Sequence, residues 1–287
     1  MTPGSLHDRL AETLGSRVAN ATVLQGGCVA DTRLIDLGDG RRVVVKVDHA
    51  QKPGLAVEGM MLEYLGETGR VPVPTVLHSE PDLLVMDHVA HDGKRAAEGE
   101  IEAADMLARL HAVSADRYGF ACDTRVGSLV QPNDWMDEWP RFFAERRLLH
   151  MGRRAHKAGS LPPGTLDRLE RLAADIDRLI DPQPLRPSLI HGDVWPGNVL
   201  WHAGRVAAFI DPAISFSDPE IELAFIDLFG CFGTAFWDRY AEISTIRPGF
   251  FEKRKDLYNL YPLLVHATLF DGGYGASVER SIGTLGY

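Results

Sequence analysis

The chain is organised around the stretch Leu189-Ile190-His191-Gly192-Asp193-Val194-Trp195-Pro196-Gly197-Asn198-Val199-Leu200. Apolar residues lead into this stretch and out of it, whereas Gly and Pro interrupt its middle. This pattern predicts a strand, a tight loop and a second strand, with the polar side chains held on the loop. The loop is therefore the first candidate for a functional site.

The polar residues of this loop have the spacing that phosphoryl transfer requires. Asp193 and Asn198 stand at the offset of the kinase catalytic loop, where Asp orients the attacking hydroxyl and Asn holds a magnesium ion. A turn at Ala203-Gly204 leads to a second strand that ends at Asp211, whose carboxylate can reach the same metal. The metal must neutralise charge while a base positions the alcohol, so the three side chains are needed together. His-Gly-Asp alone is weak evidence, but the longer pattern predicts a phosphotransferase site.

Length and composition describe an ordinary globular enzyme. The 287 residues favour two lobes, and 45% hydrophobic with 24% charged residues is typical of a soluble protein. The net charge of −10 argues against a nucleic-acid binder, and a soluble acidic surface explains it best. Three widely spaced cysteines favour a reducing, cytoplasmic environment. We expect no membrane span and no signal peptide, because no apolar run is long enough.

The first part of the chain predicts a short helix followed by a glycine-containing flap. A capping box at Ser5 opens a helix that ends at Gly15. Gly26 and Gly27 then lie between two extended segments, which form a flap whose backbone can approach phosphates. Hairpins use glycine routinely, so this pair carries little weight by itself.

Lys46 is a charged residue inside a strand of valines, where a buried charge needs a partner. Its neighbours Val45 and Val47 point to the opposite face of the strand. A helix expected over residues 55–67 carries Glu58 and Glu63, and Glu58 is the better placed of the two to meet Lys46. The alternative is that Lys46 is an exposed lysine of an edge strand.

The chain changes from β-rich to helical near residue 88. Strands are expected over residues 75–78 and 83–86, and helical periodicity begins at about Glu98. We expect an ATP-binding lobe over residues 1–88 and a catalytic and substrate lobe over residues 89–287. Further helices are expected over residues 133–152, 165–180, 219–229, 235–243 and 250–270. The fold class is therefore α+β, with a small β-rich lobe and a larger, mainly helical one.

Several separate motifs together resemble the fructosamine kinase (ketosamine-3-kinase) family, which shares the kinase-like fold of the aminoglycoside phosphotransferases. They cover nearly the whole chain and are Gly26-Gly27-Cys28, Val45-Lys46-Val47, Val57-Glu58-Gly59, Leu84-Val85-Met86-Asp87-His88, Gln131-Pro132-Asn133-Asp134-Trp135, Trp139-Pro140-Arg141-Phe142-Phe143, His191-Gly192-Asp193-Val194-Trp195-Pro196-Gly197-Asn198, Asp211-Pro212-Ala213 and Pro219-Glu220-Ile221-Glu222-Leu223-Ala224. Family members typically have Leu and either Ser or Gly where this chain has Val194 and Pro196, and the proline removes one loop N–H.

The resemblance implies a role for each motif in an ATP- and Mg²⁺-dependent reaction. Asp193 would be the catalytic base, and Asn198 with Asp211 would hold Mg²⁺ against the phosphates. Lys46, fixed by Glu58, would bind the α- and β-phosphates, beneath the flap of Gly26 and Gly27. The backbone of Asp87, His88 and Val89 would receive adenine.

Two features predict a small acceptor instead of a protein-kinase substrate. Trp195 stands where a protein kinase has a phosphate-facing lysine, and the segment from Asp211 to Glu220 is too short for an activation loop. Trp195 would lie against a sugar ring, or else would pack the loop. Asp218 and Glu220 would meet a cationic amine, whereas Glu222 is better explained as an anchor between its helix and the catalytic loop.

The sequence thus predicts a kinase that phosphorylates the sugar O3 of a ketosamine, free or protein-bound, which in the family leads to release of the amine and deglycation. The alternatives are a kinase of the same fold for an aminoglycoside, choline or homoserine, and an ATP-binding protein without catalysis. We expect a monomer or weak dimer. Cys28, in the flap, is either a redox switch or a small apolar residue.

Overall fold

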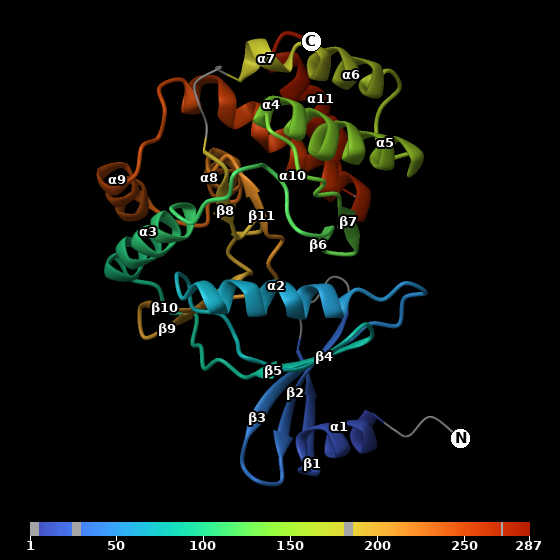
Figure 1. The fold of residues 1–287 in the computed structure, drawn as a ribbon, viewed down its shortest axis with the longest axis vertical. Helices are drawn as coiled ribbons and strands as arrows, with labels where there is room; N and C mark the ends of the chain where they lie inside the picture. The colour runs from blue at the N-terminus through green and yellow to red at the C-terminus, as the bar shows by residue number, and fades with distance from the viewer. Residues whose placement is uncertain (1–5, 25–29, 181–185, 271) are drawn as a thin grey trace.

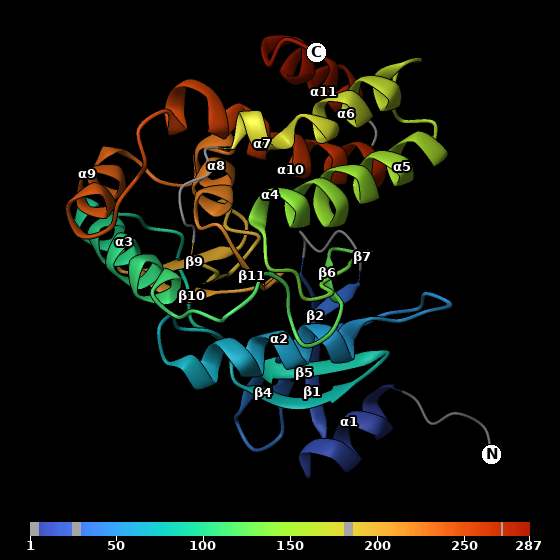
Figure 2. The same cartoon turned by 45° about the horizontal axis from the view of Figure 1, so that its top comes forward.

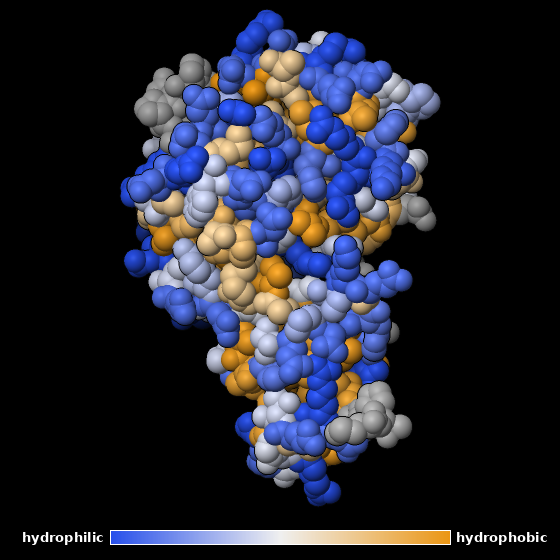
Figure 3. All heavy atoms as spheres, turned by 45° about the vertical axis from the view of Figure 1, so that its right-hand side comes forward, coloured by the Kyte–Doolittle hydropathy of each residue, from blue (hydrophilic) through white to orange (hydrophobic). Residues whose placement is uncertain are grey.

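The computed structural model describes residues 6–24, 30–180, 186–270 and 272–287 of the chain. The chain forms a small lobe built on a β-sheet and a larger, mainly helical lobe, which lie one above the other in Figure 1. Polar residues cover most of the face shown in Figure 3, with apolar side chains among them near the junction of the lobes. Within the described residues, no helix is both long and apolar enough to cross a bilayer.

A five-stranded antiparallel sheet forms the small lobe. In spatial order its strands are β1 (Val18–Val23), β2 (Asp31–Leu37), β3 (Arg42–Val47), β5 (Leu83–Asp87) and β4 (Val76–Glu80). The valine-rich β3 pairs with β2 on one side and with β5 on the other. It is therefore a central strand, which suits β-branched side chains that pack on both faces.

The two faces of the sheet are covered by different helices. Helix α1 (Leu6–Leu14) packs on the face that carries Val45, whereas α2 (Leu55–Thr68) packs on the face that carries Leu84. Since side chains alternate along a strand, Lys46 faces α2. The expected orientation of Lys46 is confirmed, and its alternative interpretation as an edge-strand lysine is wrong.

The large lobe is mostly helical. Its helices are α3 (Ala97–His111), α4 (Trp139–Phe142), α5 (His150–Lys157), α6 (Thr165–Ala174), α7 (Ile176–Leu179), α8 (Glu220–Leu228), α9 (Thr234–Ile243), α10 (Lys255–Leu269) and α11 (Tyr274–Thr284), with π-helical turns η1 (Phe143–Leu149) and η2 (Phe250–Arg254). Aromatic and aliphatic side chains of these elements form one extended core. Short antiparallel pairs complete the lobe, namely β6 (Thr124–Val126) with β7 (Leu129–Gln131), β8 (Ser188–Ile190) with β11 (Ser215–Ser217), and β9 (Val199–His202) with β10 (Arg205–Phe209).

Some expected helices have different limits in the structure. The helix expected over residues 133–152 begins only at Trp139, next to Pro140, and continues through the π-helical turn η1. The helix expected over residues 165–180 is interrupted at Asp175, which separates α6 from α7. Strands β6, β7 and β11 and the last helix α11 were not expected. Three-residue strands are too short to show an alternating pattern.

Helix α2 packs against both lobes. Its residues Met61 and Leu65 belong to the large core, although the helix also covers the small sheet. Figure 2 shows α2 between the sheet and the large lobe. Since α2 contributes to both cores, the junction is a packed interface. The division of the chain at residue 88 stays a prediction.

Candidate active site

Two strand pairs bring the catalytic loop and Asp211 together. The loop connects β8 to β9, and Asp211 follows β10, which pairs with β9. Strand β11 then pairs back onto β8, and the N–H of Ala213 donates to the carbonyl of His191 at 2.7 Å. The tight turn at Ala203 and Gly204 has positive φ at both residues, as a two-residue hairpin requires. The expected strand, loop and strand are confirmed.

Asn198 is fixed by Asp193 in an orientation that suits a metal ligand. Its side-chain Nδ2 donates to the backbone oxygen of Asp193 at 3.0 Å and to the Asp193 carboxylate at 2.7 Å. Because the amide nitrogen is used in this way, the remaining Oδ1 is available as an oxygen ligand. Carboxylate and amide oxygens are suitable donors for Mg²⁺.

Asp211 supplies the second candidate oxygen ligand. Its backbone has φ of 54°, in the left-handed region that Asp tolerates better than most residues. Among the described residues, no three His, Cys, Asp or Glu side chains form a metal cluster on their own. A Mg²⁺ ion commonly takes one or two protein ligands and completes its shell with phosphate oxygens and water. The pair of Asn198 and Asp211 therefore fits such an ion.

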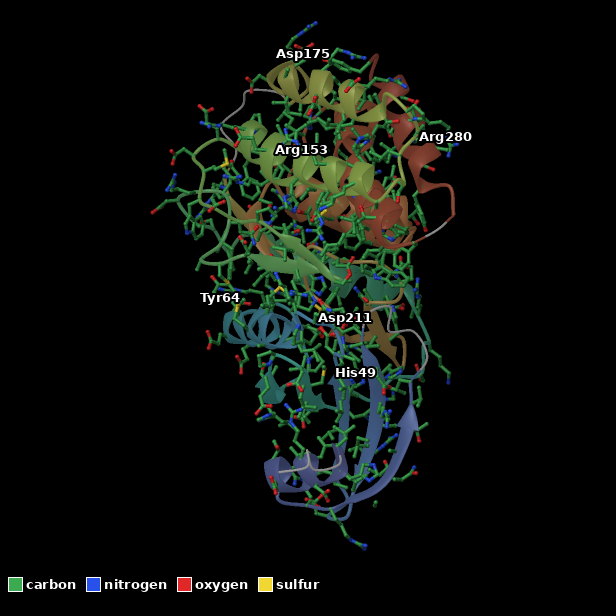
Figure 4. The ribbon with its side chains drawn as sticks, turned by 90° about the vertical axis from the view of Figure 1, so that its right-hand side faces the viewer. His49, Tyr64, Arg153, Asp175, Asp211 and Arg280 are labelled. Carbon is green, nitrogen blue, oxygen red and sulfur yellow. The ribbon has the colours of Figure 1, made fainter. Side chains whose placement is uncertain are left out.

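Lys46 connects the two lobes through two carboxylates. Its Nζ lies 2.7 Å from Glu58 Oε1 in α2 and 2.5 Å from Asp211 Oδ1 in the large lobe. Figure 4 shows Asp211 at the level where the lobes meet. Burial disfavours the charged amine, but Asp211 and Glu58 outweigh this effect and raise the pKa of Lys46. The expected pairing of Lys46 with Glu58, and not with Glu63, is confirmed.

Asp193 has the electrostatic environment of a base. Burial, followed by the negative charge of Asp211, raises the pKa of Asp193 to about 8, while the hydrogen bond from Asn198 opposes the shift. A carboxylate whose pKa lies near neutrality accepts a proton better than an ordinary one. Once deprotonated, Asp193 is therefore a stronger base toward an alcohol held beside it than an ordinary carboxylate.

Glu222 anchors the catalytic loop from helix α8. The carboxylate of Glu222 is fully buried. One of its oxygens accepts a hydrogen bond from the N–H of Gly192 at 2.6 Å, and the other lies 2.8 Å from His111 Nε2. His111 Nδ1 in turn lies 2.7 Å from the hydroxyl of Tyr240. The residue before Asp193 is thus tied to three helices, α8, α3 and α9. The expected role of Glu222 as an anchor is confirmed.

Replacing Glu222 by Gln tests this anchor. Each oxygen of the Glu222 carboxylate accepts one hydrogen bond, whereas a carboxamide has one oxygen that accepts and one NH₂ group that donates. In the variant, the N–H of either Gly192 or His111 would therefore face the NH₂ group and lose its acceptor. We expect kcat to fall about tenfold and the free energy of unfolding to fall by about 1–3 kcal/mol. Steady-state kinetics and urea unfolding measure the two effects. Glu252→Gln, at an exposed position, is the control, and equal kcat in both variants contradicts the anchor.

A cavity of about 140 Å³ lies between the lobes. It is lined by the four residues expected at the phosphates and metal, Lys46, Asp193, Asn198 and Asp211. Trp195 also lines it and is 37% exposed, with its ring folded against Gly197. A Cβ at Gly197 would lie 2.4 Å from that ring, so a larger residue there would require the ring to move. Trp195 therefore both packs on the loop and faces the cavity.

The segment expected to receive adenine has part of its backbone already in use. The N–H of Asp87 donates to the carbonyl of Thr75, and the N–H of His88 donates to that of Arg42. The His88 N–H is therefore already in use, and the expected binding of adenine by this segment stays a prediction. Among the described residues, the N–H of Val89 has no backbone acceptor. None of Asp87, His88 and Val89 lines the cavity of 140 Å³.

Asp218 and Glu220 do not face an acceptor, and the expected contact with a cationic amine is wrong. Both are buried, with 1% and 2% of their surface exposed. Asp218 forms an ion pair with Arg247 and accepts a hydrogen bond from the hydroxyl of Tyr258. Glu220 forms ion pairs with Arg247 and Arg254. Charges buried at this depth need such partners. The two acids are therefore members of a buried cluster of ion pairs within the large lobe.

Three of the expected residues lie outside the described part of the chain. These are Gly26 and Gly27 of the flap and Cys28, so their roles stay predictions. The cavity also contains residues that were not expected, notably Arg125 and His266. Arg125 comes from the short hairpin β6–β7, which the sequence pattern does not predict. His266 is the one ionisable residue in residues 262–269 of α10, and such an isolated polar residue is the signal that was available.

Comparisons with known proteins show which family the chain resembles over its length. The family model described as fructosamine kinase matches residues 5–285. A probable ketoamine kinase from Synechocystis sp. is 30% identical, over 97% of this chain and 95% of its own. A chloroplastic protein-ribulosamine 3-kinase from Oryza sativa subsp. japonica is 29% identical, over 95% of this chain and 80% of its own.

Solved structures give the same result for the fold. A candidate fructosamine-3-kinase from Thermobifida fusca superposes with a TM-score of 0.87 at 31% identity, and 98% of each chain is covered. A thermostable mutant of aminoglycoside phosphotransferase APH(4)-Ia, in complex with AMP-PNP and hygromycin B, gives a TM-score of 0.65 at 19% identity, over 99% of this chain and 98% of its own. The second likeness shows the fold alone. The expected two-lobed, kinase-like fold is confirmed.

Proposed function

The chain belongs to the fructosamine kinase family and is a phosphotransferase, and from this premise we propose that it transfers the γ-phosphoryl group of ATP to the sugar O3 of ketosamines. The observation that carries the proposal is the convergence of Lys46, Asp193, Asn198 and Asp211 on one cavity between the lobes. The relatives named as ketoamine and ribulosamine kinases support this acceptor class. Membership of an enzyme family argues against the alternative of an ATP-binding protein without catalysis.

Each residue of the site has a role in this reaction. Lys46, held by Glu58, would bind the α- and β-phosphates, and Asn198 with Asp211 would hold Mg²⁺, which would neutralise charge on the phosphates. Asp193 accepts the proton of the sugar hydroxyl. The carbonyl of Asp87 and the N–H of Val89 receive adenine, and the flap of Gly26 and Gly27 covers the phosphates. Residues 1–88 then form the ATP-binding lobe and residues 89–287 the catalytic lobe.

Phosphorylation of a protein-bound ketosamine at O3 is the step that leads to release of the amine, so we place the enzyme in the repair of glycated proteins or amines. Trp195 lines the cavity and is 37% exposed to solvent. This exposure supports an acceptor that reaches the site from solvent. Three widely separated cysteines support a reducing, cytoplasmic environment. We expect the acceptor to be a fructosamine or a ribulosamine.

A substrate panel tests the proposal. The purified protein is assayed for ATP-dependent phosphorylation of fructosamines and ribulosamines, free and lysine-linked, and of an aminoglycoside, choline and homoserine. We expect kcat/KM for ketosamines to be at least about a hundredfold higher than for the other alcohols. A site that binds the hydroxyls of the ketosamine sugar leaves some of its own polar groups unpaired when the acceptor lacks those hydroxyls. Turnover on one of the other alcohols without turnover on any ketosamine refutes it.

Trp195→Ala separates the two possible roles of this side chain. A stacked aromatic contributes on the order of 1 kcal/mol, so we expect KM for the ketosamine to rise about fivefold while KM for ATP stays nearly constant. Trp135→Ala is the matched control, because Trp135 has 36% exposure but does not line the cavity. If Trp195 only packs the loop, its loss lowers kcat and the melting temperature together, and ketosamine KM does not change selectively.

A further inference from the structure

Arg125 is a residue of the large lobe that reaches the small lobe beside the cavity. It lies in β6, which contacts α2 (Figure 1). Its Nη2 donates a hydrogen bond to the backbone oxygen of Lys52 at 3.2 Å. The guanidinium also lies against Gly54, because a Cβ built there would be 2.4 Å from its Nε and Nη1. Arg125 therefore contacts the segment that leads into α2, and its own side chain lines the cavity.

Arg125 is the cation of the cavity that has no carboxylate partner. Among the described residues that line the cavity, Lys46 and Arg125 carry a positive charge at pH 7, since burial lowers the pKa of His266. Lys46 already lies between Glu58 and Asp211. Arg125 forms no ion pair within the part of the chain that the structure describes, and its bond to a backbone carbonyl uses one of its five N–H donors. Most of the guanidinium is therefore available to an anion that enters the cavity.

A bound nucleotide would add negative charge to a cavity that is already acidic. The carboxylates of Asp48, Glu58 and Asp211 line the cavity, and Lys46 offsets only part of their charge. The γ-phosphoryl group of ATP has terminal oxygens that share its charge. A guanidinium matches such a group, because it stays charged and donates two parallel N–H···O hydrogen bonds to two oxygens at once. Arg125 supplies this group at the wall of the cavity.

We propose that Arg125 binds the γ-phosphoryl group of ATP and stabilises its charge during transfer. The inference rests on the proposed function, in which Lys46 binds the α- and β-phosphates and Asp193 faces the acceptor hydroxyl. The γ-phosphoryl group then lies between these two residues, and Arg125 lines the same cavity as both. In the free enzyme, Lys52 and Gly54 hold the guanidinium at this wall, so little reordering is needed when ATP binds.

The charge that Arg125 stabilises develops as the phosphoryl group moves. The hydroxyl oxygen of the sugar forms a bond to the γ-phosphorus, and its proton passes to Asp193. The bond between the γ-phosphorus and the oxygen that bridges to the β-phosphate breaks, so ADP keeps that oxygen and the bonding electrons. A cation that is already in place offsets the negative charge on these oxygens. Loss of Arg125 should therefore lower kcat as well as the affinity for ATP.

Binding of ATP and of ADP to Arg125→Gln tests the contact without an acceptor. Each nucleotide is titrated calorimetrically in the presence of Mg²⁺. We expect the affinity for ATP to fall about ten- to a hundredfold, as the loss of a hydrogen bond to a charged group implies, and the affinity for ADP to stay nearly constant. If Arg125 only positions α2, and with it Lys46, both nucleotides lose affinity to the same extent. An unchanged ratio of ATP to ADP affinity therefore overturns the inference.

Two further variants complete the test. Arg125→Lys keeps the charge but not the paired donors, so we expect its ATP affinity and its kcat on a ketosamine to lie between those of Arg125→Gln and the wild type. Values no higher than those of Arg125→Gln overturn the role of the charge. Arg154→Gln, at an exposed position of α5, is the control and should match the wild type. A wild type that binds ATP but phosphorylates no ketosamine overturns the proposed acceptor instead, so the two failures are distinguished.

Discussion

Asp193→Asn is expected to lower kcat by roughly a hundredfold or more, because the variant keeps the shape of the side chain and loses the proton acceptor. ATP affinity should change little, since the residue acts on the acceptor hydroxyl. We expect the free energy of unfolding to stay nearly unchanged. Burial and the charge of Asp211 raise the pKa of Asp193 to about 8, so the charged form of this side chain is disfavoured in the free enzyme. A neutral amide at this position therefore resembles the protonated carboxyl group of the free enzyme.

Steady-state kinetics on a ketosamine, ATP binding and a melting curve give the three measurements for Asp193→Asn. Asp167→Asn, at an exposed position of α6, is the matched control. The assignment fails if the variant retains turnover close to that of the wild type. A variant with lost turnover and a lower melting temperature indicates a structural effect instead, which the isosteric change is chosen to avoid.

Asp211→Ala is expected to remove the dependence of nucleotide binding on Mg²⁺. The substitution takes away the carboxylate that fits the ion, so the negative phosphates repel one another without compensation. The metal contributes several kcal/mol, which corresponds to a loss of about a hundredfold or more in kcat/KM. Lys46 keeps Glu58 as its partner at 2.7 Å, so the small lobe stays intact.

Calorimetric titration of ATP with and without Mg²⁺ measures the effect of Asp211→Ala. The wild type should bind ATP more tightly with the ion, and the variant should bind equally in both conditions. Asp177→Ala, at an exposed position of α7, is the control. A variant that gains as much affinity from Mg²⁺ as the wild type rules out Asp211 as a ligand.

The chemistry of the site was predictable where a local pattern encodes it. The loop from His191 to Asn198 is bounded by apolar strands and broken by Gly and Pro, so strand alternation and turn chemistry identify it. Lys46 was predictable because a charged residue in an apolar strand requires a partner. Its pairing with Glu58 followed from the helix expected next in the chain.

Other features depend on contacts between distant parts of the chain, and local patterns do not contain them. Asp218 and Glu220 look like exposed acids in the sequence, yet Arg247 and Arg254 bury them from a segment further along the chain. Strand β11 has three residues and exists because β8 lies beside it. His266 lines the cavity together with Asp193, although the two residues are far apart in the sequence.

The contact between Lys46 and Asp211 also joins the two lobes of the free protein, because Lys46 lies in β3 and Asp211 follows β10. Under the proposed function, Lys46 would turn to the phosphates and Asp211 to the metal. The ion pair of the free protein would then compete with nucleotide and metal, so its re-formation would favour release of the product.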